Sequence, residues 1–362
     1  MSLVGAQRAE AAFLDRDPWP VVWLRRTVTV GVTCLLLATA LAAAPFWIPI
    51  AWLLDRALPG RCTLRCGLFL TYYLACEVLG ILAAVGLWIR AALRGPSGPG
   101  GPRHLEGLFA LQRLWSGALL RGAIRIFGFR IEAEGAEHTD RPMLLMLRHV
   151  SVADTLLASE LVSRPHLIHL RYVLKRELLW DPCLDLVGNR LPNYFVRRDS
   201  TDSEREIQGI RDLMADLGSH EGVLIYPEGT RFSRVKRERI IRRLRDGGHL
   251  GLAARAERLE HTLPPRLGGT LALLDANPGL DVVFVAHSGF ESVASFWELW
   301  NGALRDAVVR VKFWRVPALE IPRGREDRIE WLYERWQTMD RWLAQHSGPS
   351  RPGEPRVDAA TG

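Results

Sequence analysis

The chain has few cysteines and no internal repeat, and each absence excludes a class of protein. Its five cysteines form no C-x-x-C pair, and Cys62 and Cys66 have no histidine or cysteine partners nearby, so we expect neither a disulfide framework nor a structural metal. Without a Gly-X-Y or heptad period the chain is not fibrous, and with 48% apolar and 24% charged residues it is not disordered. The chain therefore folds around a core.

Two long apolar segments occupy the first hundred residues. Thr27–Leu54 contains no charged residue, and Gly67–Ile89 contains one, Glu77. At about 1.5 Å per residue, each segment is long enough to cross a hydrocarbon core of roughly 30 Å, which predicts a two-helix transmembrane hairpin over residues 27–94. A cleaved signal peptide fits worse because its apolar stretch is shorter, while a re-entrant hairpin in one leaflet stays open. We expect Glu77 to pair with a neighbour or to lie near the interface, because a carboxylate in lipid is costly.

Basic residues flank both ends of this predicted hairpin. They are Arg16, Arg25 and Arg26 before it and Arg90, Arg94, Arg103 and Arg113 after its second segment. The positive-inside rule then makes residues 1–26 a cytoplasmic segment, although three arginines in the connecting loop oppose this orientation. The excess of arginine over lysine is typical of GC-rich bacterial genomes. Together with the flanking charges, it predicts an integral protein of the inner (cytoplasmic) membrane whose main domain faces the cytoplasm.

The rest of the chain divides by composition. The run GPSGPGGP at residues 95–102 predicts a linker, and residues 347–362 have too little apolar content to pack and are expected to be disordered. One domain remains, residues 103–346. Alternating strand and helix patterns in it predict an α/β layer fold with a largely buried sheet. The predicted strands are Met143–Leu147, Val223–Pro227 and Asp281–Ala286, and the predicted helices are Ser203–Leu217 and Arg325–His346.

Candidate catalytic residues follow the first predicted strand. His149 comes just after Met143–Leu147, and Asp154 lies in or near the first turn of a helix expected to begin near Ser151. A carboxylate bonded to one imidazole nitrogen fixes the tautomer, so that the other nitrogen can take a proton from a hydroxyl. Because no G-x-S-x-G elbow accompanies the pair, we expect the nucleophile to be a substrate hydroxyl. Taken alone, the spacing also fits a helix-capping Asp154 and a partly buried polar His149.

A second group of residues follows the strand Val223–Pro227. In Glu228-Gly229-Thr230-Arg231 the glycine allows close backbone approach, and the arginine can hold a phosphate through paired hydrogen bonds. The run from Arg231 to Arg245 has eight basic residues and one acidic residue, a net charge of +7 that equals the charge of the whole chain. Without interleaved aromatics or a nucleic-acid module, it favours anionic lipid headgroups or a phosphorylated substrate over nucleic acid. A solvated basic helix face stays open.

These motifs together resemble those of the glycerolipid acyltransferases, the family that contains 1-acylglycerol-3-phosphate acyltransferase. His149-x4-Asp154 resembles the first motif, and Pro227–Arg231 resembles the third. Between them, Phe195-Val196-Arg197-Arg198 resembles the second motif, commonly F-I-D-R. The segments Leu263–Gly269 and Trp331–Trp336 resemble one branch of the family, that of the lysocardiolipin and lysophosphatidylinositol acyltransferases. The chain departs from the family pattern at Arg148, where many members have asparagine, and in Val283–Ala286, where a fourth motif usually contains proline.

The resemblance implies an α/β fold with a mixed sheet and an O-acyltransferase activity. His149 would deprotonate the hydroxyl of a lysophospholipid, most simply 1-acylglycerol-3-phosphate, and Asp154 would orient His149. The acyl group would come directly from acyl-CoA or acyl carrier protein as co-substrate, with no cofactor and no metal. Backbone N–H groups near Ser151 are candidates to stabilise the oxyanion. The implied substrate-binding residues are Ser151, Phe195, Arg198, Glu228, Gly229, Thr230, Arg231 and Lys236.

Two alternatives to this function stay open. The acceptor could be another lysolipid, such as lysophosphatidylinositol, lysocardiolipin, a lyso-glycolipid or a lyso-amino lipid. In the other alternative, a non-catalytic membrane protein binds anionic lipid through its basic segment. The sequence fixes neither the acyl donor nor the oligomeric state.

Overall fold

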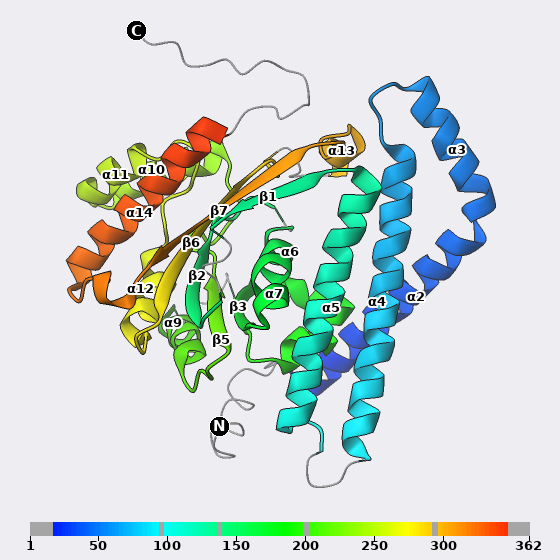
Figure 1. The fold of residues 1–362 in the computed structure, drawn as a ribbon, viewed down its shortest axis with the longest axis horizontal. Helices are drawn as coiled ribbons and strands as arrows, with labels where there is room; N and C mark the ends of the chain where they lie inside the picture. Colours follow the sequence, from blue (N-terminus) through cyan, green and yellow to red (C-terminus); the bar gives the residue numbers. More distant parts are fainter. Residues whose placement is uncertain are drawn as a thin grey trace.

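The computed structural model describes residues 17–93, 98–135, 140–151, 153–197, 203–291 and 296–346. These residues form a seven-stranded sheet with helices on both faces and a group of long helices along one side (Figure 1). Arg198 and the predicted tail at 347–362 lie outside the described residues, as do parts of the predicted N-terminal segment and linker.

The sheet is mixed and largely buried, as predicted. Its strand order is β1-β7-β6-β2-β5-β3-β4, and neighbouring strands are parallel except for β6 and β7. The strands are β1 (Arg130–Glu134), β2 (Met143–Leu147), β3 (His169–Lys175), β4 (Tyr194–Val196), β5 (Glu221–Ile225), β6 (Asp281–Ser288) and β7 (Val308–Val316). The central strands β2, β5 and β6 are almost wholly buried because helices cover both of their faces.

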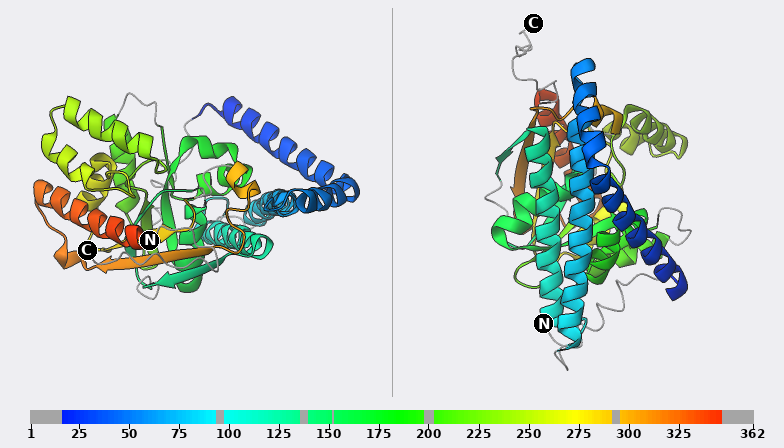
Figure 2. Two further views of the ribbon diagram at one scale, coloured as in Figure 1. Left: turned by 90° about the horizontal axis from the view of Figure 1, so that it is seen from above. Right: turned by 90° about the vertical axis from the view of Figure 1, so that its right-hand side faces the viewer.

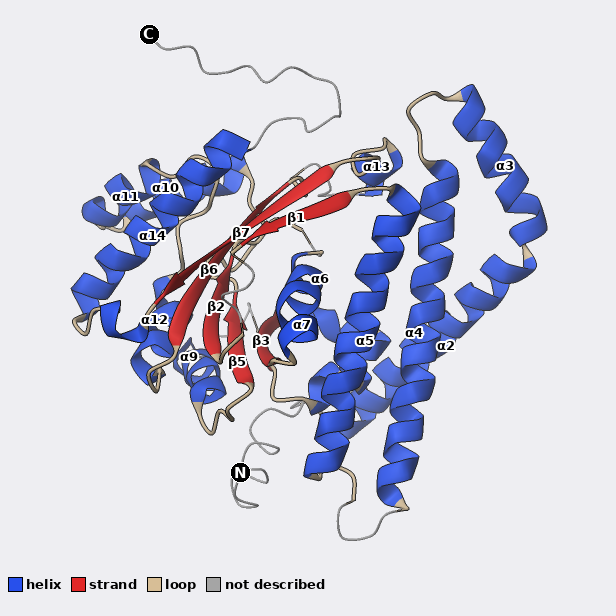
Figure 3. Ribbon diagram, viewed as in Figure 1, coloured by secondary structure: helices blue, strands red, loops and turns tan. Residues whose placement is uncertain are grey.

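Helices form a layer on each face of the sheet. In Figure 3, α9, α12 and α14 lie on one side, α5, α6 and α7 lie on the other, and α2 to α4 lie outside α5. The helices are α2 (Trp19–Ala42), α3 (Ala44–Ala57), α4 (Thr63–Ala92), α5 (Pro102–Phe127), α6 (Asp154–Ala158), α7 (Arg164–His166), α8 (Pro182–Leu186), α9 (Ser203–Arg211), α10 (Arg234–Asp246), α11 (Leu250–Glu257), α12 (Leu267–Ala276), α13 (Phe296–Trp300) and α14 (Arg325–His346). Short helical turns occupy Ser159–Ser163, Arg176–Trp180, Gly188–Arg190, Asp212–Met214 and Ala318–Glu320.

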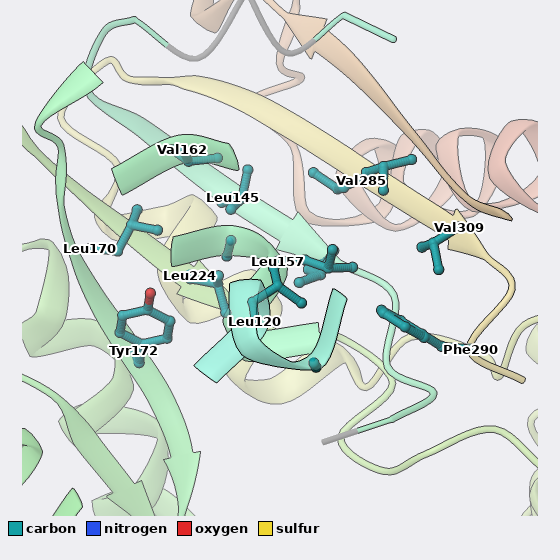
Figure 4. Packing of buried hydrophobic residues seen from close by; sticks show 14 of the residues in the cluster. Leu120, Leu145, Leu157, Val162, Leu170, Tyr172, Leu224, Val285, Phe290 and Val309 are labelled. Carbon is teal, nitrogen blue, oxygen red and sulfur yellow. The ribbon is translucent and has the colours of Figure 1, made fainter. Parts of the chain in front are cut away.

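The two faces of the sheet belong to two hydrophobic cores. On the face toward α5 and α6, Leu145 and Val285 of the strands meet Leu120 and Leu157 of the helices (Figure 4). The next residue along β2, Leu144, packs into the other core, under α12 and α14. Burial on both faces explains why these strands are continuous apolar runs in the sequence.

The first apolar segment is bent, so the expected continuous helix over Thr27–Leu54 is wrong. Helix α2 begins earlier, at Trp19, and ends at Ala42, and α3 begins two residues later. Pro45 explains the break, because it has no N–H for the carbonyl of Leu41 and its ring crowds that carbonyl. Figure 1 shows the chain changing direction between α2 and α3.

The second apolar segment forms one helix, α4, as predicted, and α4 lies beside α5 along its length (Figures 1 and 2). Glu77 of α4 is fully buried and accepts hydrogen bonds from Trp115 Nε1 (3.0 Å) and from the backbone N–H of Cys183 (3.2 Å). Glu77 is thus paired with neighbours, as expected. Cys62 and Cys66 belong to the same core as β2, so the long helices and the sheet form one packed unit.

Helices α2 and α4 are long and apolar enough to cross a membrane. One side of α4 is buried against the protein from Cys66 to Ala91, while the other side exposes apolar residues such as Leu79 and Leu82 (65% and 61% exposed). Arg25 and Arg26 of α2 both contact the carboxylate of Asp185, which fixes the start of α2 to α8. The long helices therefore present an apolar outer surface while being held firmly to the domain.

Candidate functional site

Three functional segments meet at one edge of the sheet. β2, β5 and β6 are adjacent and parallel, so their carboxyl ends lie together. His149 follows β2, the turn from Tyr226 to Phe232 follows β5, and His287 lies at the end of β6. In α/β sheets this edge is the usual place for a ligand site.

His149 and Asp154 form the predicted pair, called the dyad from here on. His149 Nδ1 lies 2.9 Å from Asp154 Oδ2. Because a carboxylate only accepts, Nδ1 carries the proton and Nε2 is left as a proton acceptor. The side chain of His149 is 13% exposed, whereas that of Asp154 is fully buried. The pair can therefore take a proton from a hydroxyl group placed against Nε2.

The Asp154 carboxylate is held by several donors. Its Oδ2 also accepts from the backbone N–H groups of Val150 (2.7 Å) and Ser151 (2.9 Å), and its Oδ1 lies 3.2 Å from His287 Nε2. Burial opposes ionisation, but the charge of His287 and the hydrogen bond from His149 outweigh it and hold the pKa of Asp154 well below its ordinary value. The N–H groups of Val150 and Ser151 are therefore engaged by Asp154, so these two are not the donors for an oxyanion in this structure.

The turn after β5 fixes the backbone of His149. Glu228 Oε1 accepts from the His149 N–H (3.1 Å), and the Phe232 N–H donates to the His149 carbonyl (3.0 Å). The other Glu228 oxygen accepts from the Leu263 N–H (3.0 Å). Burial raises the pKa of Glu228 to about 7, although Arg148 and the two N–H donors favour its charged form. Glu228 is fully buried and positions His149, which differs from the substrate contact that the sequence predicts for it.

Arg148 is also buried beside the dyad. Its guanidinium donates to the carbonyls of His287 (2.7 Å) and His261 (2.8 Å) and pairs with Glu291 (2.5 Å). Burial opposes ionisation of Glu291, but the Arg148 charge lowers the pKa of that carboxyl below its ordinary value. Arg148 therefore ties the end of β2 to the end of β6 through a paired buried charge.

The turn after β5 depends on its glycine and on a lysine. Gly229 has a φ of +63°, and a Cβ there would lie 2.7 Å from the Arg266 side chain. Lys236 Nζ donates to Thr230 Oγ1 (3.1 Å) and to the Arg231 carbonyl (3.0 Å). Lys236 and Thr230 thus brace the turn with each other, while Arg231 lines a neighbouring cavity.

The remaining predicted residues have different positions. Ser151 lines the same cavity, and its hydroxyl accepts from the Ala153 N–H (3.2 Å). Phe195 packs in the core under α5 and α6 and is not part of the cavity wall, so its predicted substrate contact is not found. Arg198 lies outside the described residues.

The apolar cavity has a volume of about 440 Å³ and lies between the sheet and helices α4 and α5. Its wall is mostly apolar and includes Phe69 of α4 and Leu120 and Ala123 of α5. Because Ser151 and Arg231 also line it, the cavity reaches the catalytic edge of the sheet. An alkyl chain can therefore lie in the cavity while its polar end stays near Ser151 and Arg231.

Sequence reasoning missed two buried residues of this site, Arg148 and His287. The signal for His287 is its place directly after the predicted strand Asp281–Ala286, because a polar residue at the carboxyl end of a buried strand is a candidate site residue. Arg148 had a similar signal, a charged residue between a buried strand and His149. Its role depends on carbonyl groups from distant segments, which no local pattern shows.

Comparisons with known proteins agree with this geometry. Residues 130–269 match the family model described as Acyltransferase. Over 213 residues the chain is 25% identical to the mouse (Mus musculus) 1-acyl-sn-glycerol-3-phosphate acyltransferase epsilon, a match that covers 56% of this chain and 57% of the relative. The fold is similar to that of the 1-acyl-sn-glycerophosphate acyltransferase PlsC from Thermotoga maritima, with a TM-score of 0.51 at 15% identity, covering 79% of this chain and 97% of that one.

The fold and the site define an α/β protein that carries a His–Asp pair at the ends of its central strands, with an apolar cavity that reaches the same edge of the sheet. Residues 130–269 are thus similar to the Acyltransferase family, and the fold of the chain is similar to that of PlsC.

Proposed function

We propose that the protein transfers an acyl group from acyl-CoA or acyl carrier protein to the free hydroxyl of a lysophospholipid, and that 1-acylglycerol-3-phosphate is the acceptor, giving phosphatidic acid. The observation that carries this proposal is the continuity of the site: the apolar cavity reaches from α4 to Ser151 and Arg231, beside the dyad. A lysophospholipid combines the three features that this site suits, namely an alkyl chain, a hydroxyl and a phosphate.

The proposed reaction is a direct transfer in which the chain's own residues move one proton. His149 Nε2 takes the proton of the acceptor hydroxyl as the oxygen bonds to the thioester carbonyl carbon. Asp154, ionised and fixed by Val150 and Ser151, stabilises the imidazolium that forms. The carbon–sulfur bond then breaks, and His149 returns the proton to the leaving thiolate. No metal or cofactor takes part in this proposal.

The acceptor class is tested with a panel of lysolipids. Membranes that contain the protein are supplied with labelled oleoyl-CoA and with lysophosphatidic acid, lysophosphatidylinositol, lysocardiolipin or a lyso-glycolipid, and the labelled product is separated by headgroup. We expect lysophosphatidic acid to be acylated fastest. Faster acylation of another headgroup would overturn the assigned acceptor while leaving acyl transfer intact.

The position of Arg231 predicts a selective loss of phosphate recognition. We expect Arg231→Ala to raise the KM for lysophosphatidic acid roughly 10- to 100-fold, because a hydrogen bond to a charged group contributes about 1.5–3 kcal/mol. The control is Arg325→Ala, an exposed arginine at the start of α14, outside the basic run. Steady-state kinetics in mixed micelles provide the measurement. An unchanged KM in the Arg231 variant, or an equal rise in both variants, would contradict a phosphate contact by Arg231.

The cavity predicts a dependence on acyl-chain length. Ala123 of α5 lines the cavity, so a larger side chain there should occupy space that the chain would fill. We expect Ala123→Phe to shift the preferred chain by several carbons toward shorter substrates, since each CH₂ kept out of the apolar cavity forfeits about 0.8 kcal/mol. Ala118→Phe, on the same helix but outside the cavity wall, is the control. An unchanged profile for C8 to C18 donors and acceptors would exclude this cavity as the chain site.

The outer surface supports membrane association, and we place the protein on the cytoplasmic face of the cytoplasmic membrane. α4 exposes an apolar side but packs along its length on α5, which carries Arg113, Arg121 and Arg125. Because α5 carries these arginines, α4 and α5 cannot both lie in hydrocarbon. We therefore propose that only the apolar side of α4 enters one leaflet, as in a re-entrant hairpin. Figure 2 shows α2 and the basic α10–α11 pair extending toward the same side of the molecule, where both can reach one lipid surface.

A further inference from the structure

We propose that His287 is a positioning residue for the acyl transfer, which holds the second oxygen of the Asp154 carboxylate. The inference rests on the proposed function for its kinetic consequence. Its structural part, a contact between two buried side chains, stands on the geometry alone.

The contact comes from two adjacent strands. In the sheet register Leu147 of β2 lies opposite Val285 of β6, so His149 and His287, each two residues further on, leave neighbouring strands at the same level. His287 is fully buried, and its Nε2 lies 3.2 Å from Asp154 Oδ1. The carboxylate thus lies between two imidazoles, one from each strand end.

Within the described residues, neither Asp154 Oδ1 nor the His287 ring has a hydrogen-bond partner elsewhere. Asp154 Oδ2 is bonded to His149 and to two backbone N–H groups, but within the described residues no hydrogen bond reaches Oδ1, and none reaches either ring nitrogen of His287. A buried charged oxygen without a donor is costly. The His287 Nε2–H is the group placed to donate to Oδ1, although it is not aligned for a hydrogen bond in this structure.

The other charged groups near His287 are already paired with each other. Arg148 donates to the His287 carbonyl and pairs with Glu291. The ring of Phe290 packs edge-to-face on the imidazole, with centroids 5.8 Å apart. Asp154 is therefore the carboxylate that the imidazole itself faces.

His287 acts through Asp154 and does not touch the substrate. The side chain of His287 is fully buried, whereas the side chain of His149 is 13% exposed. By holding Oδ1 it stops the carboxylate from rotating away from His149 Nδ1. A loss of this support should lower turnover and leave substrate binding unchanged.

The test compares His287→Phe, which removes the donor but fills the volume, with His287→Gln, whose side-chain N–H can replace Nε2–H. We expect His287→Phe to lower kcat about 10- to 100-fold at unchanged KM, the range for a lost hydrogen bond to a charged group. His287→Gln should recover most of that loss. Ser288→Ala is the control, because the Ser288 hydroxyl is buried one residue away with no hydrogen bond in the described part of the chain. Wild-type kcat in a folded His287→Phe variant, or equal losses with Phe and Gln, would overturn the proposal.

A double variant separates positioning from general damage to the fold. In the His149→Ala background we expect His287→Phe to cause no further loss, because both residues act through one proton transfer. Independent, multiplying losses would contradict the proposal. If the wild type transfers no acyl group at all, the proposed function fails, and ¹⁵N NMR of labelled histidines still tests the contact. We expect the His287 signals, identified by their loss in His287→Gln, to shift in Asp154→Asn, and unshifted signals would overturn it.

Discussion

Replacing His149 by alanine is expected to lower acyl transfer by about 10²–10⁴-fold, the usual contribution of a general base. The reason is geometric: Asp154 holds His149 Nδ1 at 2.9 Å, which leaves Nε2 of this partly exposed side chain as the proton acceptor. The measurement is kcat in purified, lipid-reconstituted protein with labelled acyl donor.

The control for this variant separates catalysis from folding. His220→Ala removes an exposed histidine before β5 and should leave kcat unchanged. Both variants should stay membrane-bound and unfold cooperatively, since the backbone bonds of His149 to Glu228 and Phe232 do not need the imidazole. Turnover near the wild-type value in folded His149→Ala would remove the residue from the mechanism.

The second large effect is expected for Asp154→Asn. The amide can offer an N–H where the carboxylate only accepts, so it turns His149 to the wrong tautomer and leaves backbone N–H groups poorly paired. By analogy with the loss of the carboxylate from a serine-protease triad, kcat should fall on the order of 10⁴-fold. Asp246→Asn, at the exposed end of α10, is the matched control. A decrease of less than tenfold would show that His149 works without its carboxylate.

Asp154 also predicts a dependence of stability on pH. The pKa of its carboxyl is lowered in the folded state, so its ionised form stabilises the fold above the ordinary aspartate pKa of about 4. That stabilisation is lost as the pH falls below this value. The difference in Tm between wild type and Asp154→Asn should therefore narrow between pH 6 and pH 3. A difference that stays constant over this range would contradict the lowered pKa.

Much of the sheet could be predicted because its strands are buried on both faces. Met143–Leu147 forms β2 with the predicted bounds, and Arg325–His346 forms α14 with the predicted bounds. The predicted helix Ser203–Leu217 is shorter in the structure, since α9 ends at Arg211 and a helical turn follows. The bend between α2 and α3 was missed because a count of apolar residues ignores the missing N–H of Pro45.

The site was predicted in part, and the reason lies in sequence distance. The His149–Asp154 pair is local, and the structure places the two side chains as the motif implies. Glu228 accepts from backbone N–H groups, including that of His149, and Lys236 donates within the turn after β5. Which backbone groups need these partners depends on the fold and is not visible in the sequence. His287 comes from a strand more than a hundred residues away, and only the sheet register brings it to Asp154.

The most direct test of the central claim is whether the protein makes phosphatidic acid. Vesicles carrying the wild type, His149→Ala or no protein receive labelled oleoyl-CoA and lysophosphatidic acid, and labelled phosphatidic acid is followed over time. We expect product only with the wild type, with one free thiol released per labelled chain transferred. No product with the wild type, from acyl-CoA or from acyl carrier protein, or equal product with His149→Ala, would contradict the account.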